Sequence, residues 1–238
     1  METKILQSEI AFIKRSVNPL NAAFYMESMS KYTKECAGIP NADEKQQTAE
    51  LAADAYYKLA EIYMNEANPF SSLNCVLGCR ELYDMVPQSE HIAFMLLQAI
   101  TGLSYVKNQL HEDGMVEEYM DEALELAERF PKNADIQRQT AMCIANLVAL
   151  CGGFDAPLGL AYDAVERMGA VAERFPGDED LQNMYAHILI SACYFANGTK
   201  NQTRLAQFRG QLRQLQAERA NVLDANAIRG HLSQIGLA

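Results

Sequence analysis

The chain has 238 residues, of which 49% are hydrophobic and 21% charged, and its formal net charge is −11. That hydrophobic content excludes an intrinsically disordered chain, and the length is sufficient to bury a sizeable core. The negative charge disfavours nucleic acid and anionic lipid as partners, because their phosphates carry the same sign. The first 18 residues are interrupted by charges, unlike a secretory signal, and no run of 18 uncharged apolar residues occurs. We therefore expect a cytoplasmic protein that does not enter a membrane.

The N-terminal region predicts a pair of helices. Residues 3–16 have the apolar spacing of an amphipathic helix, and Asn18-Pro19 interrupts it. We expect Pro19 in the first turn of a second helix that runs to about Cys36 and ends at Gly38. Residues 1–39 are therefore interpreted as an N-terminal cap or a degenerate repeat.

Four prolines then open four successive segments at spacings of 47, 44 and 45 residues. Each is followed by Asn, Asp, Ser or Glu, whose side chains suit the first turn of a helix. The segments are residues 40–86, 87–130, 131–175 and 176–221, followed by a short capping helix in 222–238. The first helices are expected at about 42–66, 89–109, 134–151 and 179–196. The second helices are expected at about 71–85, 115–130, 156–175 and 200–221, with a last short helix at 224–235.

An internal duplication supports a repeat array. The sequence AERFPKNADIQ at 127–137 returns 45 residues later as AERFPGDEDLQ at 172–182, with seven of eleven positions identical. The second helix at 115–130 has one apolar face and an opposite acidic face, whereas the first helices are apolar all round. First helices of this kind are expected to be buried on two sides, as in stacked repeats.

The join between repeats resembles that of the tetratricopeptide (TPR) family. The residues concerned are Glu122–Leu126, which read EALEL, and Phe130–Ala134, which read FPKNA. The following Cys143–Gly152 is similar to the family's large–small–x–x–large pattern, in which a small residue lets paired helices approach closely. Candidates for that small residue are Ala145, Gly102 or Ser104, and Ser191 or Ala192. These repeats depart from the family in length, because TPR units have 34 residues.

The resemblance implies an all-α, right-handed α–α superhelix, a TPR-like solenoid of antiparallel helix pairs. Its first helices would line a concave groove that binds protein or peptide ligands. Six groove candidates follow from this implication: Gln98, Tyr105, Gln139, Asn146, Tyr185 and Tyr194.

Catalytic and metal-binding motifs do not appear in the sequence. Cys75-x-x-x-Cys79 could form half of a zinc site, but no second pair matches it, and a buried apolar face is the favoured interpretation. The six cysteines are expected to be reduced and buried. Cys143, Cys151 and Cys193 would need a neighbouring base to act as nucleophiles, and His187, the one candidate, is favoured as a core histidine. We expect no catalytic, cofactor or metal-binding residues, and a protein that is not an enzyme.

Charge is distributed unevenly along the chain. Residues 199–238 carry six basic and two acidic residues, a net of +4, which leaves −15 on the first 198. A polar cap is favoured over a nucleic-acid site for this basic end. The acidic face of 117–128 is favoured as solvated surface over a site for a basic peptide.

The sequence thus favours an adaptor or scaffold that binds another protein or a peptide through the concave groove. Three alternatives stay open: a ligand- or peptide-sensing regulatory domain, an all-α enzyme of unknown reaction, and a self-assembling protein. A homodimer is compatible with each of them.

Overall fold

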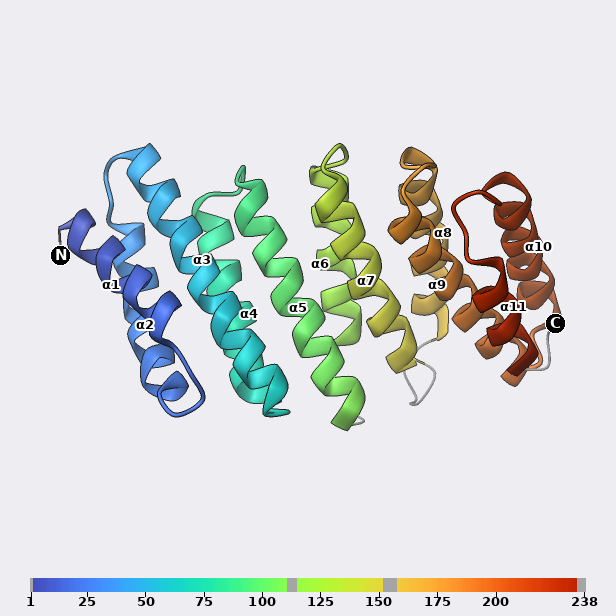
Figure 1. The fold of residues 1–238 in the computed structure, drawn as a ribbon, viewed down its shortest axis with the longest axis horizontal. Helices are drawn as coiled ribbons and strands as arrows, with labels where there is room; N and C mark the ends of the chain where they lie inside the picture. The colour runs from blue at the N-terminus through green and yellow to red at the C-terminus, as the bar shows by residue number, and fades with distance from the viewer. Residues whose placement is uncertain (1, 111–114, 152–157, 235–238) are drawn as a thin grey trace. The chain divides into compact units, whose positions relative to one another are not determined.

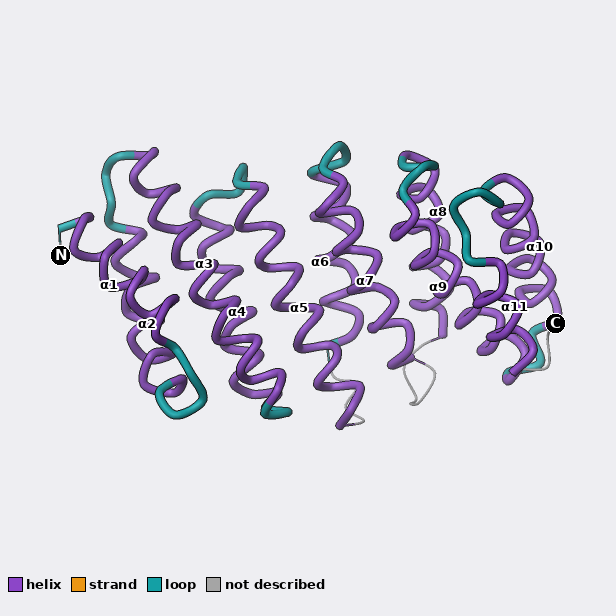
Figure 2. The backbone as a smooth tube through the Cα atoms, viewed as in Figure 1, coloured by secondary structure: helices purple, strands orange, loops and turns teal. Residues whose placement is uncertain are grey.

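A computed structural model describes residues 2–110, 115–151 and 158–234, and within these ranges the chain is all-α, with no strand (Figure 1). Where the connections are described, short loops join successive helices (Figure 2). The described helices are α1 (Thr3–Ser16), α2 (Ala22–Ala37), α3 (Ala42–Asn65), α4 (Pro69–Met85), α5 (Glu90–Leu110), α6 (Val116–Arg129), α7 (Ala134–Cys151), α8 (Leu158–Arg174), α9 (Glu179–Gly198), α10 (Gln202–Glu218) and α11 (Ala225–Gln234). The all-α fold class and the order of the predicted helices are confirmed. None of the described helices is both long and apolar enough to cross a membrane.

The chain divides into two compact units, Met1–Leu110 with α1 to α5 and His111–Ala238 with α6 to α11. The division falls between α5 and α6, inside the range 87–130 that the sequence predicts as one repeat.

In the first unit, α1, α3 and α5 form one layer and α2 and α4 form the other (Figure 1). The central helix α3 packs against all four of the others. Consecutive helices run antiparallel because the loops between them are short.

In the second unit, α9 packs against α7, α8, α10 and α11, and α7 packs against α6, α8 and α9. Both helices bury side chains on more than one face, including Gln137 and Gln182 beside the apolar core residues. The apolar-all-round pattern of the first helices therefore does correspond to burial on two sides, as the sequence predicts.

Polar residues after the four prolines cap the helices that follow. Each side-chain oxygen accepts a hydrogen bond from the backbone N–H three residues later, at 2.9 to 3.2 Å. The four capping residues are Asn41, Ser89, Asn133 and Asp178. Such caps satisfy donors that have no partner within the helix, and this explains why the predicted starts of these four helices are accurate.

Pro19 does not lie in the first turn of a helix, contrary to the sequence prediction. Residues 18–21 form a turn in which the side chain of Asn21 accepts a hydrogen bond from the backbone N–H of Asn18 at 2.7 Å. Helix α2 begins only at Ala22. The Asn18–Asn21 contact closes the turn first, so the helix starts three residues later than expected.

Among the described glycines, Gly78 has the least room for a side chain, and it is not among the small residues expected from the sequence. A Cβ atom on Gly78 of α4 would lie 2.2 Å from Cζ of Tyr56 on α3. By contrast, a Cβ atom on Gly102, one of the selected small residues, would lie 3.7 Å from Met64 Sδ, an ordinary contact distance. The tight contact therefore involves α4, the second helix of its pair, where the Tyr56 ring packs directly against the backbone at Gly78.

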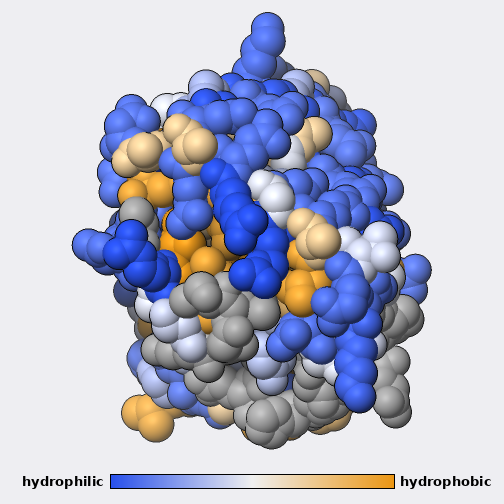
Figure 3. Space-filling model, turned by 90° about the vertical axis from the view of Figure 1, so that its right-hand side faces the viewer, coloured by the Kyte–Doolittle hydropathy of each residue, from blue (hydrophilic) through white to orange (hydrophobic). Residues whose placement is uncertain are grey.

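The end of the second unit that carries α10 and α11 is mostly hydrophilic in the view of Figure 3. Apolar residues show only in limited areas between polar side chains there. In α10 the apolar residues Leu205, Phe208 and Leu212 are buried, which leaves the polar residues of this helix on the outside.

Candidate functional site

The six groove residues predicted from the sequence lie on α5, α7 and α9 and differ in exposure. Tyr105 and Tyr194 are exposed, by 45% and 54%, whereas Tyr185 is buried. The amide side chains of Gln98, Gln139 and Asn146 are half-buried. Gln139 and Asn146 lie seven residues apart, which places them on one side of α7, but Tyr185 and Tyr194 lie on different sides of α9. Their role as ligand contacts stays a prediction.

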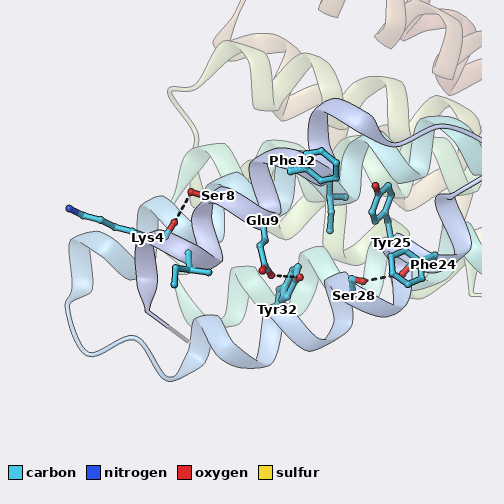
Figure 4. A pocket seen from close by; sticks show the side chains of 10 residues that line it. Lys4, Ser8, Glu9, Phe12, Phe24, Tyr25, Ser28 and Tyr32 are labelled. Atoms are coloured by element: carbon cyan, nitrogen blue, oxygen red, sulfur yellow. Dashed lines mark hydrogen bonds between the residues drawn. The ribbon is translucent and has the colours of Figure 1, made fainter.

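Exposed apolar side chains gather instead at the N-terminal helix pair. Ile5 and Phe12 on α1 are 49% and 55% exposed, and Phe24 on α2 is 68% exposed. They line a groove of about 560 Å³ between these two helices (Figure 4). Exposed apolar residues scattered singly need no explanation, but a cluster in a groove indicates a binding surface.

Helix α1 supplies one wall of the groove because its apolar residues form two stripes. Leu6, Ile10 and Ile13 are buried. Ile5 and Phe12 are seven residues apart, which is two helical turns, so they share a second, exposed face.

Helix α2 supplies the opposite wall from residues spaced by three or four positions. Phe24, Tyr25, Ser28 and Tyr32 point into the groove from this helix (Figure 4). The Tyr25 ring meets the Phe12 ring edge-on at a centroid distance of 6.4 Å, so it links the two walls. The aromatic end of the groove is thus held in a fixed shape, while the faces of Phe12 and Phe24 stay open to solvent.

One polar contact crosses the groove. The Tyr32 hydroxyl donates a hydrogen bond to the carboxylate of Glu9 (Figure 4). This hydrogen bond, together with partial burial and the charges of Glu9 and Glu35, raises the pKa of Tyr32 to about 12. Tyr32 therefore stays neutral at physiological pH, and Glu9 places a negative charge in a largely apolar groove.

A second polar cluster ties α1, α3 and α5 together. Asp54 on α3 accepts hydrogen bonds from Lys14 Nζ at 2.6 Å and from His91 Nε2 at 2.8 Å. Burial disfavours the charged form of Asp54, but the two hydrogen bonds and the two positive charges outweigh it and hold its pKa below the ordinary value. These charges satisfy one another, so this cluster stabilises the layer of first helices and leaves no obvious vacancy for a ligand.

The described residues contain no group of three or more His, Cys, Asp and Glu side chains placed to hold a metal ion. All six cysteines are buried, as predicted, and none of them forms a disulfide within the described structure. Burial raises the pKa of Cys36 to about 11 and the pKa of Cys75 well above its ordinary value. Cysteines with such pKa values remain thiols near neutral pH and are poor nucleophiles.

The groove between α1 and α2 was not found by sequence analysis, although a signal for it exists. Residues 3–16 have the apolar spacing of an amphipathic helix, but Ile5 and Phe12 are out of phase with Leu6, Ile10 and Ile13. A helix with two apolar stripes in a terminal position is a candidate for binding on its outer side.

Comparison with known proteins gives no match, either among protein-family models or among curated proteins. The resemblance to the TPR family therefore rests on the residues of the joins between helices.

Proposed function

We propose that this chain is a TPR-like helical-repeat protein that binds an amphipathic helix of another protein, seated in the groove between α1 and α2. The single observation that carries the binding proposal is the exposure of Phe12 and Phe24 on facing walls of that groove. In this proposal, the helix pairs form the right-handed array that the TPR resemblance implies, and the chain is an adaptor rather than an enzyme.

The repeated joins support the array. In the first join, Gln137 Nε2 donates to the backbone oxygens of Ala127 and Phe130, at 2.8 and 3.0 Å. In the second join, Gln182 Nε2 donates to the oxygens 45 residues later, Ala172 and Phe175, at 2.8 and 2.9 Å. Two copies of one sequence motif thus make the same contacts, as expected of structural repeats.

The packing of the first unit supports a helix as the occupant. Helix α3 packs against both α1 and α2, and α5 packs in the same way against both α3 and α4. A helix pair in this fold therefore accepts a further helix between its two members. The groove between α1 and α2 would accept a helix in the same way, and in this proposal that helix belongs to another protein.

The chemistry of the groove specifies the occupant. Ile5 and Phe12 are two turns apart, so they match apolar anchors at positions i and i+7 of a bound helix. Glu9 lies between Ile5 and Phe12 in the sequence and would pair with a Lys or Arg of the bound helix. Burial of the exposed parts of Ile5, Phe12 and Phe24 would stabilise the complex by about 25 cal/mol per Å² of apolar surface removed from water.

Display of a library of amphipathic helical peptides tests the proposal. Peptides selected on the full chain should bind at least about tenfold more weakly to the double variant Phe12→Gln, Phe24→Gln. The matched control is Tyr105→Gln, Tyr194→Gln, which removes two exposed aromatic residues from the predicted concave face and should bind normally.

Equal binding by wild type and the Phe12, Phe24 variant would reject the groove as the site. Loss of binding only in the Tyr105, Tyr194 variant would return the site to the concave face predicted from the sequence. Sedimentation velocity on the same proteins identifies a third case, in which the occupant is a second copy of this chain. A concentration-dependent dimer that disappears with Phe12 and Phe24 would replace the partner helix with that copy.

A further inference from the structure

A small polar cavity lies in the second unit between α8, α9 and α10, and it does not depend on the groove at α1 and α2. Its volume is about 140 Å³, enough for several water molecules. Its lining includes Gln182, Tyr185, Gln211 and Arg219. Tyr185 is one of the six ligand contacts predicted from the sequence, and here it faces a cavity.

Three buried polar atoms of the cavity residues have no hydrogen-bond partner among the residues that the structure describes. They are Gln182 Oε1, Gln211 Oε1 and Arg219 Nε. Gln182 is only 1% exposed. Its orientation is fixed because its Nε2 donates to two backbone oxygens, which leaves Oε1 as the free end. A buried polar atom without a partner costs free energy, so two acceptors and one donor around one cavity mark a place that a polar group can occupy.

The preceding repeat shows what a glutamine in this position binds. Gln137, 45 residues before Gln182, has its Oε1 occupied by the Arg174 guanidinium, with Nη2 at 3.2 Å. Arg174 also has a counterpart 45 residues later, Arg219, because the triplet Ala-Glu-Arg occurs at 127–129, 172–174 and 217–219. Yet Arg219 Nη1 donates to the backbone oxygen of Glu218, at 3.3 Å, and no bond joins Arg219 to Gln182.

The end of α10 explains this difference. Arg174 is the last residue of α8, whereas Arg219 lies just beyond the end of α10 with φ −124° and ψ 27°. The Phe-Pro that follows Arg174 is replaced by Ala220-Asn221 after Arg219. Arg219 therefore follows the end of its helix whereas Arg174 belongs to its helix, and Gln182 Oε1 has no hydrogen-bond partner among the described residues.

The charges around the cavity favour a cation. Glu173 and Glu218 also line it, and the acceptors among its unpartnered atoms outnumber the donors. Burial, together with the Glu173 charge, raises the pKa of Tyr185 to about 12. Arg219 is the one cation among the described lining residues.

We propose that the cavity between α8, α9 and α10 binds the guanidinium group of a ligand, in the position that Arg174 occupies at Gln137. Gln182 Oε1 and Gln211 Oε1 accept its N–H groups, and Glu173 and Glu218 balance its charge. The guanidinium belongs either to an arginine side chain of a bound peptide or to a free small molecule.

Titration of the isotope-labelled full chain with Nα-acetyl-L-arginine amide, followed by amide NMR, tests the proposal. We expect saturable shifts in α8, α9 and α10, and none with the corresponding lysine compound at the same concentration. The double variant Glu173→Gln, Glu218→Gln should weaken binding by about tenfold or more. The control Glu179→Gln removes an acid that does not line the cavity and should leave binding unchanged.

Arg219→Ala distinguishes a cation site from an anion site. Removal of the competing positive charge should strengthen binding of the arginine compound by a few fold. Weaker binding in Arg219→Ala, together with competition by acetate, would overturn the proposal in favour of a carboxylate ligand. A lack of saturable shifts with any probe would show that the cavity holds only water.

Two further probes identify the source of the guanidinium. Methylguanidine represents a free small molecule, and a short peptide with one central arginine represents a partner protein. Tighter binding of the peptide by about tenfold or more would assign the cavity to peptide recognition, and equal binding would assign it to a small molecule.

Discussion

Each unit contains a contact between a tyrosine and a glycine of a neighbouring helix, but the two tyrosine hydroxyls have different surroundings. In the first unit Tyr56 of α3 lies over Gly78 of α4, and in the second unit Tyr185 of α9 lies near Gly169 of α8. The Tyr56 hydroxyl is 3.0 Å from Thr33 Oγ1 and is fully enclosed. The Tyr185 hydroxyl forms no hydrogen bond to the described residues and belongs to a cavity instead.

The difference shows that similar polar groups in a repeat protein can either stabilise the fold or remain available to a ligand. In the first unit, Asp54 finds partners across helices in Lys14 and His91. At the last join of the second unit the equivalent partner is displaced, and polar atoms remain open around a cavity. The same motif therefore stabilises the fold in one place and can hold a ligand in another.

Gly78→Ala should have the largest effect on stability. The added methyl group would lie 2.2 to 2.6 Å from three ring carbons of Tyr56, and neither the ring nor the α4 backbone can move without disturbing the core. We expect a loss of about 3 kcal/mol in the free energy of unfolding of the first unit. Hydrogen exchange of the α3 and α4 amides measures this loss locally.

Gly102→Ala is the matched control in the same unit. Its methyl group would lie 3.7 Å from Met64 Sδ, so it fits, and the helix gains roughly 0.5–1 kcal/mol from the better helix former. Equal effects of the two substitutions would refute the close contact at Gly78.

Substitution of Tyr56 and of Tyr185 by phenylalanine removes each hydroxyl and compares the two tyrosine contacts directly. Thr33 Oγ1 donates to the Met29 backbone oxygen, so the Tyr56 hydroxyl is the donor to Thr33. Tyr56→Phe removes this buried bond and should cost about 1 kcal/mol. Tyr185→Phe removes no protein hydrogen bond and should change stability by less than about 0.5 kcal/mol. Urea unfolding of both variants gives the comparison, and equal losses would contradict it.

The helix boundaries could be predicted from the sequence because they depend on local chemistry. Asn41, Asn133 and Asp178 each follow a proline and cap their helix with their own side chain. Pro19 does not mark the first turn of α2, because a competing hydrogen bond from the backbone N–H of Asn18 to the side chain of Asn21 closes the turn before the helix begins.

The candidate sites could not be predicted in the same way because they depend on directions between helices. The sequence contains Ala-Glu-Arg three times, but only the structure shows that Arg174 reaches Gln137 and Arg219 does not reach Gln182. Likewise, Ile5 and Phe12 look like core residues until the packing of α1 buries Leu6 and Ile10 instead.

A pH dependence of the first unit should give the smallest effect. The hydrogen bond to Asp54 raises the pKa of His91, assisted by the charges of Asp54 and Glu50 and opposed by burial and by Lys14. Because the folded state binds this proton more tightly, the stabilisation is fully present below the ordinary histidine pKa of about 6.5 and is lost as pH rises through the folded value. The lowered pKa of Asp54 affects stability in a different pH range, because the stability that Asp54 contributes is lost only as the pH falls below about 4.

His91 is 42% exposed on its side chain, so solvent screening reduces the effect to a few tenths of a kcal/mol. Urea unfolding at pH 6 and pH 8.5 should show the wild type losing this amount relative to His91→Gln, which cannot titrate. An identical pH dependence in both proteins would mean that the contact of His91 with Asp54 does not stabilise the layer of α1, α3 and α5. In that case the contrast with the open cavity of the second unit would rest on the other polar contacts between helices of the first unit, above all the buried pair of Tyr56 and Thr33.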